Sequence, residues 1–347
     1  MPIPSALIGD HISAQSYHSP SSIPHGILDF LRSDSLVEGP ANIILPHLLK
    51  TIEKERHNDP LPRDQLWIVC QRHGVLDFVL SCTEGPMGPY PVFIFASAPF
   101  SQLLDFDYTR PAVAALVHEL LGAGVSRERV FSIFAPEPVT EIFAAIWSQV
   151  AGVRLARSPK YYAATFTYCT AKSFINKTMT VLDGFSVSLR AAVDRDVPVI
   201  AELCQAFSET SPPFLLTFER ALEEARMLVK DGQVWVHEIR HESGEPDIAS
   251  IVAFTRVSTN VAAITKVYTN PRWRQRGCAL RLVRRVTKHL LKTKQAVVLY
   301  VSHGNPAARV YDQAGYVGLR GNAERFPGVD RWLELGFDTD VVELGHW

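Results

Sequence analysis

The fold of this chain is decided by residues 261–291, which read VAAITKVYTNPRWRQRGCALRLVRRVTKHLL. Residues 261–269 are mostly β-formers, and the pair Asn270-Pro271 ends the predicted strand. From Ala279 onward, apolar residues recur at helical spacing and basic residues occupy the other positions. The apolar positions are Ala279, Leu282, Val283, Val286 and Leu290, and the outward positions are Arg281, Arg284, Arg285, Lys288 and Lys292. The stretch therefore predicts a strand, a basic turn and a long amphipathic helix.

The basic turn between these two elements has the chemistry of an anion site. It contains the sequence RQRGCA at residues 274–279, immediately before the helix. The first amides of a helix have no acceptor within the helix and carry a partial positive charge, so they bind phosphate without a side chain. Gly277 has no Cβ and allows a ligand to approach the backbone closely. The turn therefore predicts a phosphate-binding site.

Two motifs in the C-terminal half of the chain resemble the signatures of a known family. The spacing Arg274-x-x-Gly277-x-Ala279 resembles the pyrophosphate loop of the GNAT superfamily of acyl-CoA-dependent N-acyltransferases. An apolar strand at 297–301 follows, then a segment from Asn305 to Tyr311, and this resembles the second signature of that family. The resemblance implies an α/β (α+β) fold, with a mixed, mostly antiparallel sheet flanked by helices.

The same resemblance implies that acetyl-CoA, or another acyl-CoA, binds as co-substrate, without a metal. The backbone of Val267 and Tyr268 would pair with the pantetheine arm where two strands splay apart. The amides of Gly277, Cys278 and Ala279 would hold the pyrophosphate. The predicted side-chain contacts are Arg272, Arg274, Gln275, Arg276 and Asn305, although capping of the following helix also explains Asn305 fully.

The charge pattern around the turn agrees with an anionic ligand. Residues 248–311 contain no Asp or Glu, while residues 272–294 contain nine Lys and Arg. Such a run could be a solvated helix face or a nucleic-acid surface. Because the chain as a whole has a net charge of −1, general nucleic-acid binding is not expected. The glycine turn favours CoA.

Tyr311 is the predicted catalytic side chain. It lies in the second turn of the predicted helix after Asn305, where the family often uses a tyrosine to protonate the departing thiolate; the alternative is a core tyrosine that only packs. The expected strand before the turn carries no carboxylate to serve as general base. The base could be His303, Glu238 or a chain of waters, or the reaction could need none; for His303, the alternative is an exposed loop histidine.

The first half of the chain repeats the element order of the second half. Strands, a helix, a strand, a helix and a closing strand are expected between residues 25 and 172, but no glycine loop follows Pro99. We therefore expect a loose arm at 1–24, a degenerate GNAT-like domain at 25–172 and a GNAT acyltransferase domain at 173–347. The alternative for the first half is an unrelated α/β domain. The last strand of the second domain is expected at 332–337.

The composition limits the class of protein and the compartment that we expect. Hydrophobic residues make up 47 % and charged residues 20 % of 347 residues, as in ordinary globular proteins. No apolar run reaches the ~20 residues of a membrane span, and the start of the chain does not resemble a secretory signal. Five scattered cysteines indicate reduced thiols in the cytoplasm.

The expected function is N-acetylation of a small-molecule amine. The alternatives are a non-catalytic CoA sensor and other acyl-thioester chemistry on the same fold.

Overall fold

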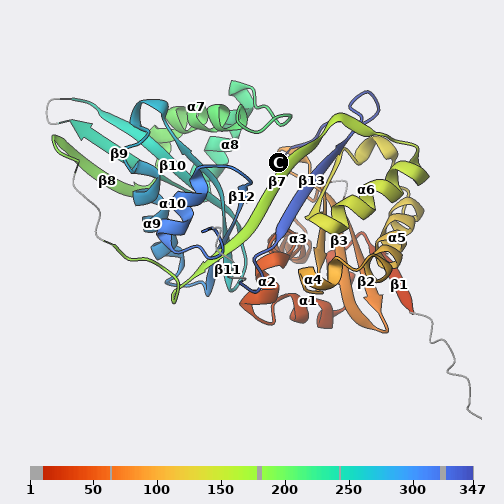
Figure 1. Cartoon of the computed structure of the whole chain (residues 1–347). Helices are drawn as coiled ribbons and strands as arrows, with labels where there is room; N and C mark the ends of the chain where they lie inside the picture. Colours follow the sequence, from red (N-terminus) through yellow and green to blue (C-terminus); the bar gives the residue numbers. More distant parts are fainter. Residues whose placement is uncertain (1–10, 63–64, 178–181, 242–243, 321–325, 347) are drawn as a thin grey trace, which may run out of the picture.

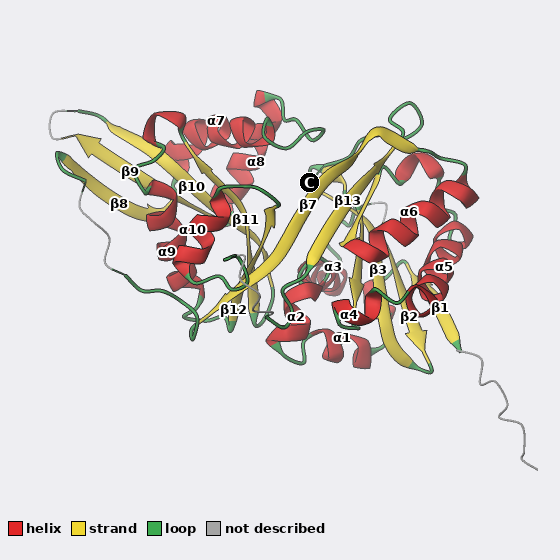
Figure 2. Ribbon diagram, in the orientation of Figure 1, coloured by secondary structure: helices red, strands yellow, loops and turns green. Residues whose placement is uncertain are grey.

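The computed structural model describes residues 11–62, 65–177, 182–241, 244–320 and 326–346. The strands form one continuous sheet in the order β1-β2-β3-β5-β6-β13-β7-β12-β11-β10-β9-β8, with β4 paired to β3 (Figure 1). Figure 2 shows helices on both faces of this sheet, with long strands crossing the middle of the molecule. The mixed α/β class is confirmed, and the two expected sheets are joined into one.

The elements of the first half follow the expected order. Their bounds are β1 (Ile12–Tyr17), α1 (His25–Leu31), α2 (Ser35–Ala41), α3 (Leu45–His57), β2 (Gln65–Arg72), β3 (Val75–Gly85), β4 (Gly88–Pro89), β5 (Val92–Ala96), α4 (Phe100–Leu103), α5 (Phe106–Gly122), β6 (Ser132–Pro136), α6 (Glu137–Ala151) and β7 (Leu155–Thr170). Short 3-10 turns lie at Pro20–Ser22 and Arg127–Arg129.

The elements of the second half include the predicted strand, turn and helix of residues 261–291. Their bounds are β8 (Phe185–Ala191), α7 (Val197–Ser208), α8 (Phe218–Lys230), β9 (Val234–His241), β10 (Pro246–Val257), β11 (Val261–Thr269), α9 (Cys278–Leu290), β12 (Ala296–Ser302), α10 (Ala307–Ala314) and β13 (Arg331–Phe337), with 3-10 turns at Asp194–Asp196 and Pro271–Trp273. Across the described residues, no helix is both long and apolar enough to cross a membrane.

The composition predicts a loose arm through residue 24, but part of that arm is a strand. β1 pairs antiparallel with β2 from its third residue to its end, with Ile12 opposite Arg72 and Tyr17 opposite Trp67. Alternate side chains of β1 point into the protein. Among them, Ile12 and Ala14 pack against a buried hydrophobic cluster beneath α5. The alternation of inward and outward residues in ISAQSY explains the strand.

The two halves exchange strands at the centre of the sheet. β7, from the first half, pairs antiparallel with β12 along Ala164–Thr170. β13, the last strand of the chain, pairs antiparallel with both β6 and β7. The strand expected at 332–337 therefore exists, but it closes the sheet of the first half rather than that of the second. Figure 1 shows β7 and β13 side by side between the two groups of helices.

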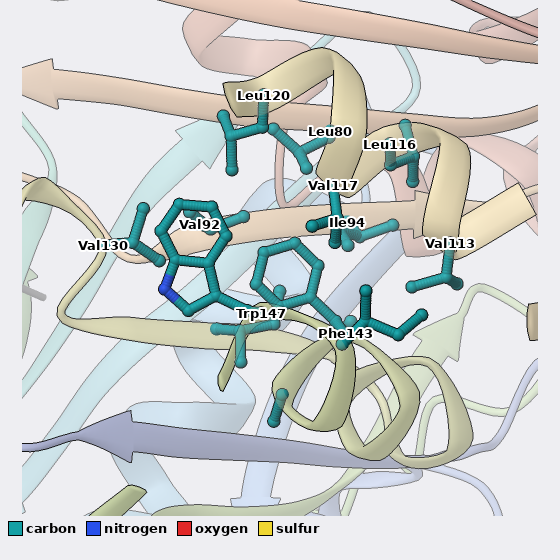
Figure 3. Close-up of a cluster of buried hydrophobic side chains, with 14 of the residues drawn as sticks. Leu80, Val92, Ile94, Val113, Leu116, Val117, Leu120, Val130, Phe143 and Trp147 are labelled. Atoms are coloured by element: carbon teal, nitrogen blue, oxygen red, sulfur yellow. The ribbon is translucent and has the colours of Figure 1, made fainter. Parts of the chain in front are cut away.

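Separate hydrophobic clusters lie on the two faces of the first half. α5 and α6 cover one face, where Phe143 and Trp147 pack against residues of β3, β5 and α5 such as Leu80, Ile94 and Leu116 (Figure 3). α1, α2 and α3 cover the other face, and their cluster extends into the second half to Ala263 and Val298. Burial of this shared apolar surface ties the halves together.

A buried carboxylate in α2 also joins the halves. Glu38 is fully buried, and its oxygens accept hydrogen bonds from the Ser258 hydroxyl (2.5 Å), the Asn260 amide (2.8 Å) and the Asn260 side chain (2.8 Å). These donors lie in the turn between β10 and β11. Asn42, at the end of α2, donates to the carbonyl of Arg256 in β10 (3.2 Å). A helix of the first half thus fixes the turn that precedes β11.

Replacing Glu38 with alanine is expected to destabilise the whole chain. The change would leave the backbone and side-chain amides of half-buried Asn260 without the Glu38 acceptor, at about 1–3 kcal/mol for each group, while the Ser258 hydroxyl would keep only the Val261 carbonyl (3.2 Å). Urea unfolding of Glu38→Ala should show a loss of at least about 2 kcal/mol. Glu53→Ala, at an exposed position of α3, is the control and should change stability by less than about 0.5 kcal/mol. Equal stability of the two variants would contradict the role of Glu38.

Candidate active site

The strands β11 and β12 are parallel neighbours that separate after a short contact. Only Val261, Ala262 and Ala263 of β11 pair with β12, opposite Ala296–Val298, although both strands continue. On its other edge, β11 stays paired with β10 as far as Thr269. The separation leaves the β12-facing edge of residues 264–269 without a strand partner in the described structure. An extended ligand arm could add to this edge.

An irregularity in β11 determines which side chains face each side of the sheet. The pairing with β10 shifts between Lys266 and Ile264, so Thr265 is an extra residue. A bulge of this kind changes the alternation of side chains along the strand. Ile264 and Val267 consequently both pack with α9, whereas Tyr268 packs with the cluster under α7 and α8. Val267 and Tyr268, the predicted pantetheine partners, follow the bulge in the open part of the strand.

The start of α9 has the geometry expected of a phosphate cradle. Gly277 precedes the helix with φ of 71°, a left-handed conformation that side chains disfavour, and Gln275 has φ of 61°. The Arg281 amide donates to the Gly277 carbonyl (3.1 Å) as the first bond of the helix. The amides of Cys278, Ala279 and Leu280 therefore have no acceptor within the helix. A Cβ on Gly277 would lie 3.2 Å from the Arg281 guanidinium.

The predicted basic side chains surround this helix start, and most are held in place. Arg274 donates to the Tyr268 hydroxyl (3.2 Å), and its guanidinium lies 5.5 Å from the centre of that ring. Arg276 lies over the ring of Trp273 at 5.2 Å. Arg272 is exposed and pairs with Asp247 (3.2 Å). These three exposed arginines give the turn a positive surface.

Arg281 differs from the expectation that it faces outward. It is 5 % exposed, and its guanidinium donates to the carbonyl of Arg276 within the turn. Helical spacing places Arg281 directly under the residues that precede the helix, so its long side chain folds back to bond the turn instead of entering solvent. The residue therefore stabilises the turn from beneath.

A buried histidine that the sequence pattern did not indicate supports the helix start. His237 of β9 is fully buried, and its Nδ1 lies 3.2 Å from the carbonyl oxygen of Cys278, to which it donates. Burial lowers the pKa of His237 to about 4, so the ring is neutral at pH 7. Burial also raises the pKa of the Cys278 thiol, although Arg281 and Arg276 oppose this shift. Cys278 is thus a small packed residue and not an activated nucleophile.

The low pKa of His237 predicts a loss of stability in mild acid. Unfolded His titrates near pH 6.5, so between about pH 6.5 and 4 the unfolded chain binds a proton that the folded chain does not. The free energy of unfolding should fall with decreasing pH by up to about 1.4 kcal/mol per unit from this residue. His237→Gln keeps a donor for Cys278 and should show a shallower slope in urea unfolding between pH 7 and 5. Identical slopes would contradict this assignment.

Tyr311 lies in α10 and packs against the core beneath α9. The side chain is 8 % exposed, and its ring meets that of Tyr316 edge-on at 5.8 Å. Burial raises the pKa of Tyr311 above its ordinary value, with a smaller contribution from Tyr162, so the phenol stays protonated at neutral pH. α10 follows β12, the strand that diverges from β11. A protonated phenol in this position is a proton donor rather than a base.

Asn305 and His303 lie in the loop between β12 and α10, and both are exposed. The Asn305 side chain accepts a hydrogen bond from the Ala307 amide (2.9 Å), so its oxygen already caps the helix. The His303 amide donates to the carbonyl of Ala163 in β7 (2.9 Å), which fixes the backbone of the loop next to the exchanged strand. Gly315 ends the helix with φ of 104°.

Glu238 and Glu224, two carboxylates of the second half, are both engaged in ion pairs. Glu238 is bound by Arg190 of β8, which also holds Asp196 (2.6 Å). Glu224 of α8, which the sequence pattern did not indicate, contacts the Lys266 ammonium with both oxygens (2.7 and 2.6 Å). Lys266 and Glu224 side chains are 11 % and 13 % exposed. This pair lies on the α7–α8 face of the open part of β11.

The corresponding place in the first half has a different chemistry. β5 and β6 also pair in parallel over a short contact, Val92–Phe93 with Ile133–Phe134. After the four-residue helix α4, the long helix α5 begins after Asp105, whose carboxylate accepts hydrogen bonds from the amides of Asp107 (3.0 Å) and Tyr108 (3.4 Å). The amides that could hold a phosphate are therefore occupied by an acidic side chain of the chain itself.

Comparison with known proteins agrees with this geometry. A family model described as FR47-like protein matches residues 247–324, which include β11, the turn, α9, β12 and α10. No curated protein matches the chain by sequence.

Solved structures of similar architecture match nearly the whole chain. One is a tandem GNAT protein from the clavulanic acid biosynthesis pathway, with 15 % identity, a TM-score of 0.51 and coverage of 93 % of this chain and 97 % of that one. A GCN5-related N-acetyltransferase from Sphaerobacter thermophilus has 15 % identity, a TM-score of 0.53 and coverage of 93 % and 94 %. A Drosophila protein has 11 % identity, a TM-score of 0.55 and coverage of 94 % and 99 %. The chain thus has the tandem GNAT fold, with the FR47-like match in its second half.

Proposed function

We propose that this protein transfers an acyl group, in the simplest case acetyl, from acyl-CoA to a small-molecule amine. The observation that carries the proposal is the glycine-started helix α9, which follows the open part of β11. The free amides at Cys278 and Ala279 would hold the pyrophosphate, with Arg272, Arg274, Gln275 and Arg276 around it. We assign this role to the second half, residues 173–347, with residues 25–172 as a degenerate GNAT-like partner.

The reaction is direct attack of the amine on the thioester in a ternary complex. The backbone of Val267 and Tyr268 would orient the pantetheine along the open edge of β11, so that the thioester lies between β11 and β12. The amine nitrogen forms a bond to the carbonyl carbon, and the carbon–sulfur bond breaks. Tyr311 gives its proton to the thiolate as the sulfur departs, and the proton that the amine nitrogen loses returns through solvent to the Tyr311 phenolate, so the products are the amide and the free thiol. Asn305 positions Tyr311 by capping its helix.

The test is a screen of amines for release of the CoA thiol from acetyl-CoA. At least one amine should give turnover that depends on Gly277, together with an acylated product visible by mass spectrometry. The alternative, a CoA sensor without catalysis, is favoured by one observation: β11 carries no carboxylate to act as base. Tight binding of acetyl-CoA without turnover by any amine of a broad panel would support the sensor.

A further inference from the structure

A second irregularity in the sheet lies beside the bulge in β11. The pairing of β10 with β11 shifts between Phe254 and Arg256, so Thr255 is an extra residue of β10. Its hydroxyl donates to that of Thr265, the extra residue of β11 (3.1 Å). A bulge changes the alternation of the side chains that follow it. Phe254 packs with α9, whereas the Arg256 guanidinium lies on the opposite face of the sheet, 5.6 Å from the ring centre of Tyr300.

The register of the sheet places Arg256 at the point where β11 and β12 separate. Arg256 pairs with Ala263, the last residue of β11 that pairs with β12, and Ala263 pairs with Val298. Tyr300 lies two residues beyond Val298 and therefore past this last pair. Ala263, Val298 and Tyr300 all pack in the cluster beneath α1, α2 and α3. The Arg256 side chain thus reaches the opening in which the thioester is proposed to lie, on the face opposite α9.

The polar groups around Arg256 distinguish this place from a packed core. Arg256, Tyr300 and Tyr162 are each partly accessible to solvent. Tyr162, from β7 of the first half, donates to the carbonyl of Tyr300 (3.1 Å). The Tyr300 hydroxyl is buried and has no hydrogen-bond partner among the residues that the structure describes. Burial raises the pKa of Tyr300, so the phenol keeps its proton and can donate it to an acceptor.

The surroundings of Arg256 also suit an anion. Burial lowers the pKa of Arg256, and Tyr300, Tyr162 and Tyr90 oppose this shift, but an arginine stays charged at neutral pH. An aromatic ring packs against the face of a guanidinium, whereas a carboxylate binds its N–H edge, so one arginine can hold both. The Asn42 side chain donates to the Arg256 carbonyl (3.2 Å) and fixes the backbone at this position.

We propose that Arg256 binds a carboxylate of the acceptor, with the Tyr300 hydroxyl as a second donor; this inference rests on the proposed acyltransferase function. The acceptor is then an amine that also carries a carboxylate, as an amino acid does. The contact would place the amine of the same molecule at the opening between β11 and β12, next to the thioester. Because a guanidinium binds a carboxylate through two parallel hydrogen bonds, it fixes orientation as well as affinity. Arg256 is therefore a specificity-determining residue.

The first experiment compares matched pairs of acceptors with the wild-type chain and acetyl-CoA. Each pair is an amino acid and its carboxamide, such as alanine with alaninamide and phenylalanine with phenylalaninamide. The amide keeps the amine and the side chain but lacks the negative charge. For at least one pair, kcat/KM should be higher for the amino acid by about 100-fold or more, as for loss of one partner of a buried charge pair.

Variants then assign this preference to the two side chains. Arg256→Gln should bring the members of each pair to nearly equal kcat/KM, through a higher KM for the amino acid, with unchanged acetyl-CoA affinity in calorimetry. Arg256→Lys keeps the charge without the planar pair of donors and should retain part of the preference. Tyr300→Phe should reduce the preference by about 10-fold. The control is Arg110→Gln in α5, which removes an arginine 5.9 Å from the ring centre of Phe106 and should behave as wild type.

The outcomes separate this inference from the function on which it rests. A wild-type chain that acylates amines without preferring the carboxylate would overturn the inference and leave the acyltransferase function standing. Equal losses for both members of a pair in Arg256→Gln would also overturn it, because a structural role or a contact with the thioester affects both acceptors alike. If Arg256→Gln does not fold, the wild-type preference and its reduction in Tyr300→Phe decide. A wild-type chain that turns over neither member of any pair, nor any other amine, would overturn both proposals together.

Discussion

Gly277→Asp should abolish measurable binding of acetyl-CoA. The position has φ of 71°, which costs a non-glycine residue about 1–3 kcal/mol. A Cβ would also press on the Arg281 guanidinium at 3.2 Å. The carboxylate would stand where the pyrophosphate is proposed to bind, and like charges in contact cost several kcal/mol. Calorimetry should show that the dissociation constant rises by at least about 100-fold.

The matched control for this variant is Gly152→Asp. Gly152 ends α6 with φ of 68°, close to that of Gly277, and a Cβ there would meet no atom within 4 Å. The control therefore adds the same side chain in the same backbone conformation, but away from α9. It should bind acetyl-CoA as the wild-type protein does. Unaffected binding by Gly277→Asp would show that the start of α9 does not hold the pyrophosphate.

Tyr311→Phe should reduce turnover by about 100-fold or more, as expected for loss of a positioned general acid. The change removes only a hydroxyl group, and the ring would keep its contact with Tyr316. The fold and the affinity for acetyl-CoA should therefore be nearly unchanged. Steady-state release of the CoA thiol and calorimetry on the same preparation measure the two effects separately.

Tyr316→Phe is the control for a phenol in the same cluster. The Tyr316 hydroxyl lies 3.0 Å from the Thr287 hydroxyl and is buried beneath α9. Its removal should lower stability by about 1 kcal/mol through the lost hydrogen bond and should leave the chemical step intact. An unchanged rate in Tyr311→Phe, or equal rates in the two variants, would remove Tyr311 from the mechanism.

Local sequence patterns predicted the elements of the second half well. The strand at 261–269 has the expected bounds, and the helix begins at Cys278, one residue before the expected start. Both elements are set by nearby residues: β-formers end at Asn270-Pro271, and Gly277 supports the left-handed turn before the helix. The GNAT fold of the second half could be predicted because both of its signatures are local in the same sense, whereas the tandem arrangement was predicted only from the repeated order of elements in the first half.

The features that depend on distant residues could not be predicted. The exchange of β7 and β13 joins residues more than a hundred positions apart, and an alternating strand pattern does not identify its partner. Glu38 gives no local sign that it binds a turn 222 residues away. The buried position of Arg281 could not be predicted either, because its place in the helix indicated a side chain exposed to solvent.

Titration calorimetry of the wild-type chain with acetyl-CoA decides whether the second half alone holds acyl-CoA. The start of α9 offers free amides, whereas the start of α5 is capped by Asp105. We therefore expect one binding site per chain. Two equivalent sites, or no binding, would show that the start of α9 is not the single acyl-CoA site.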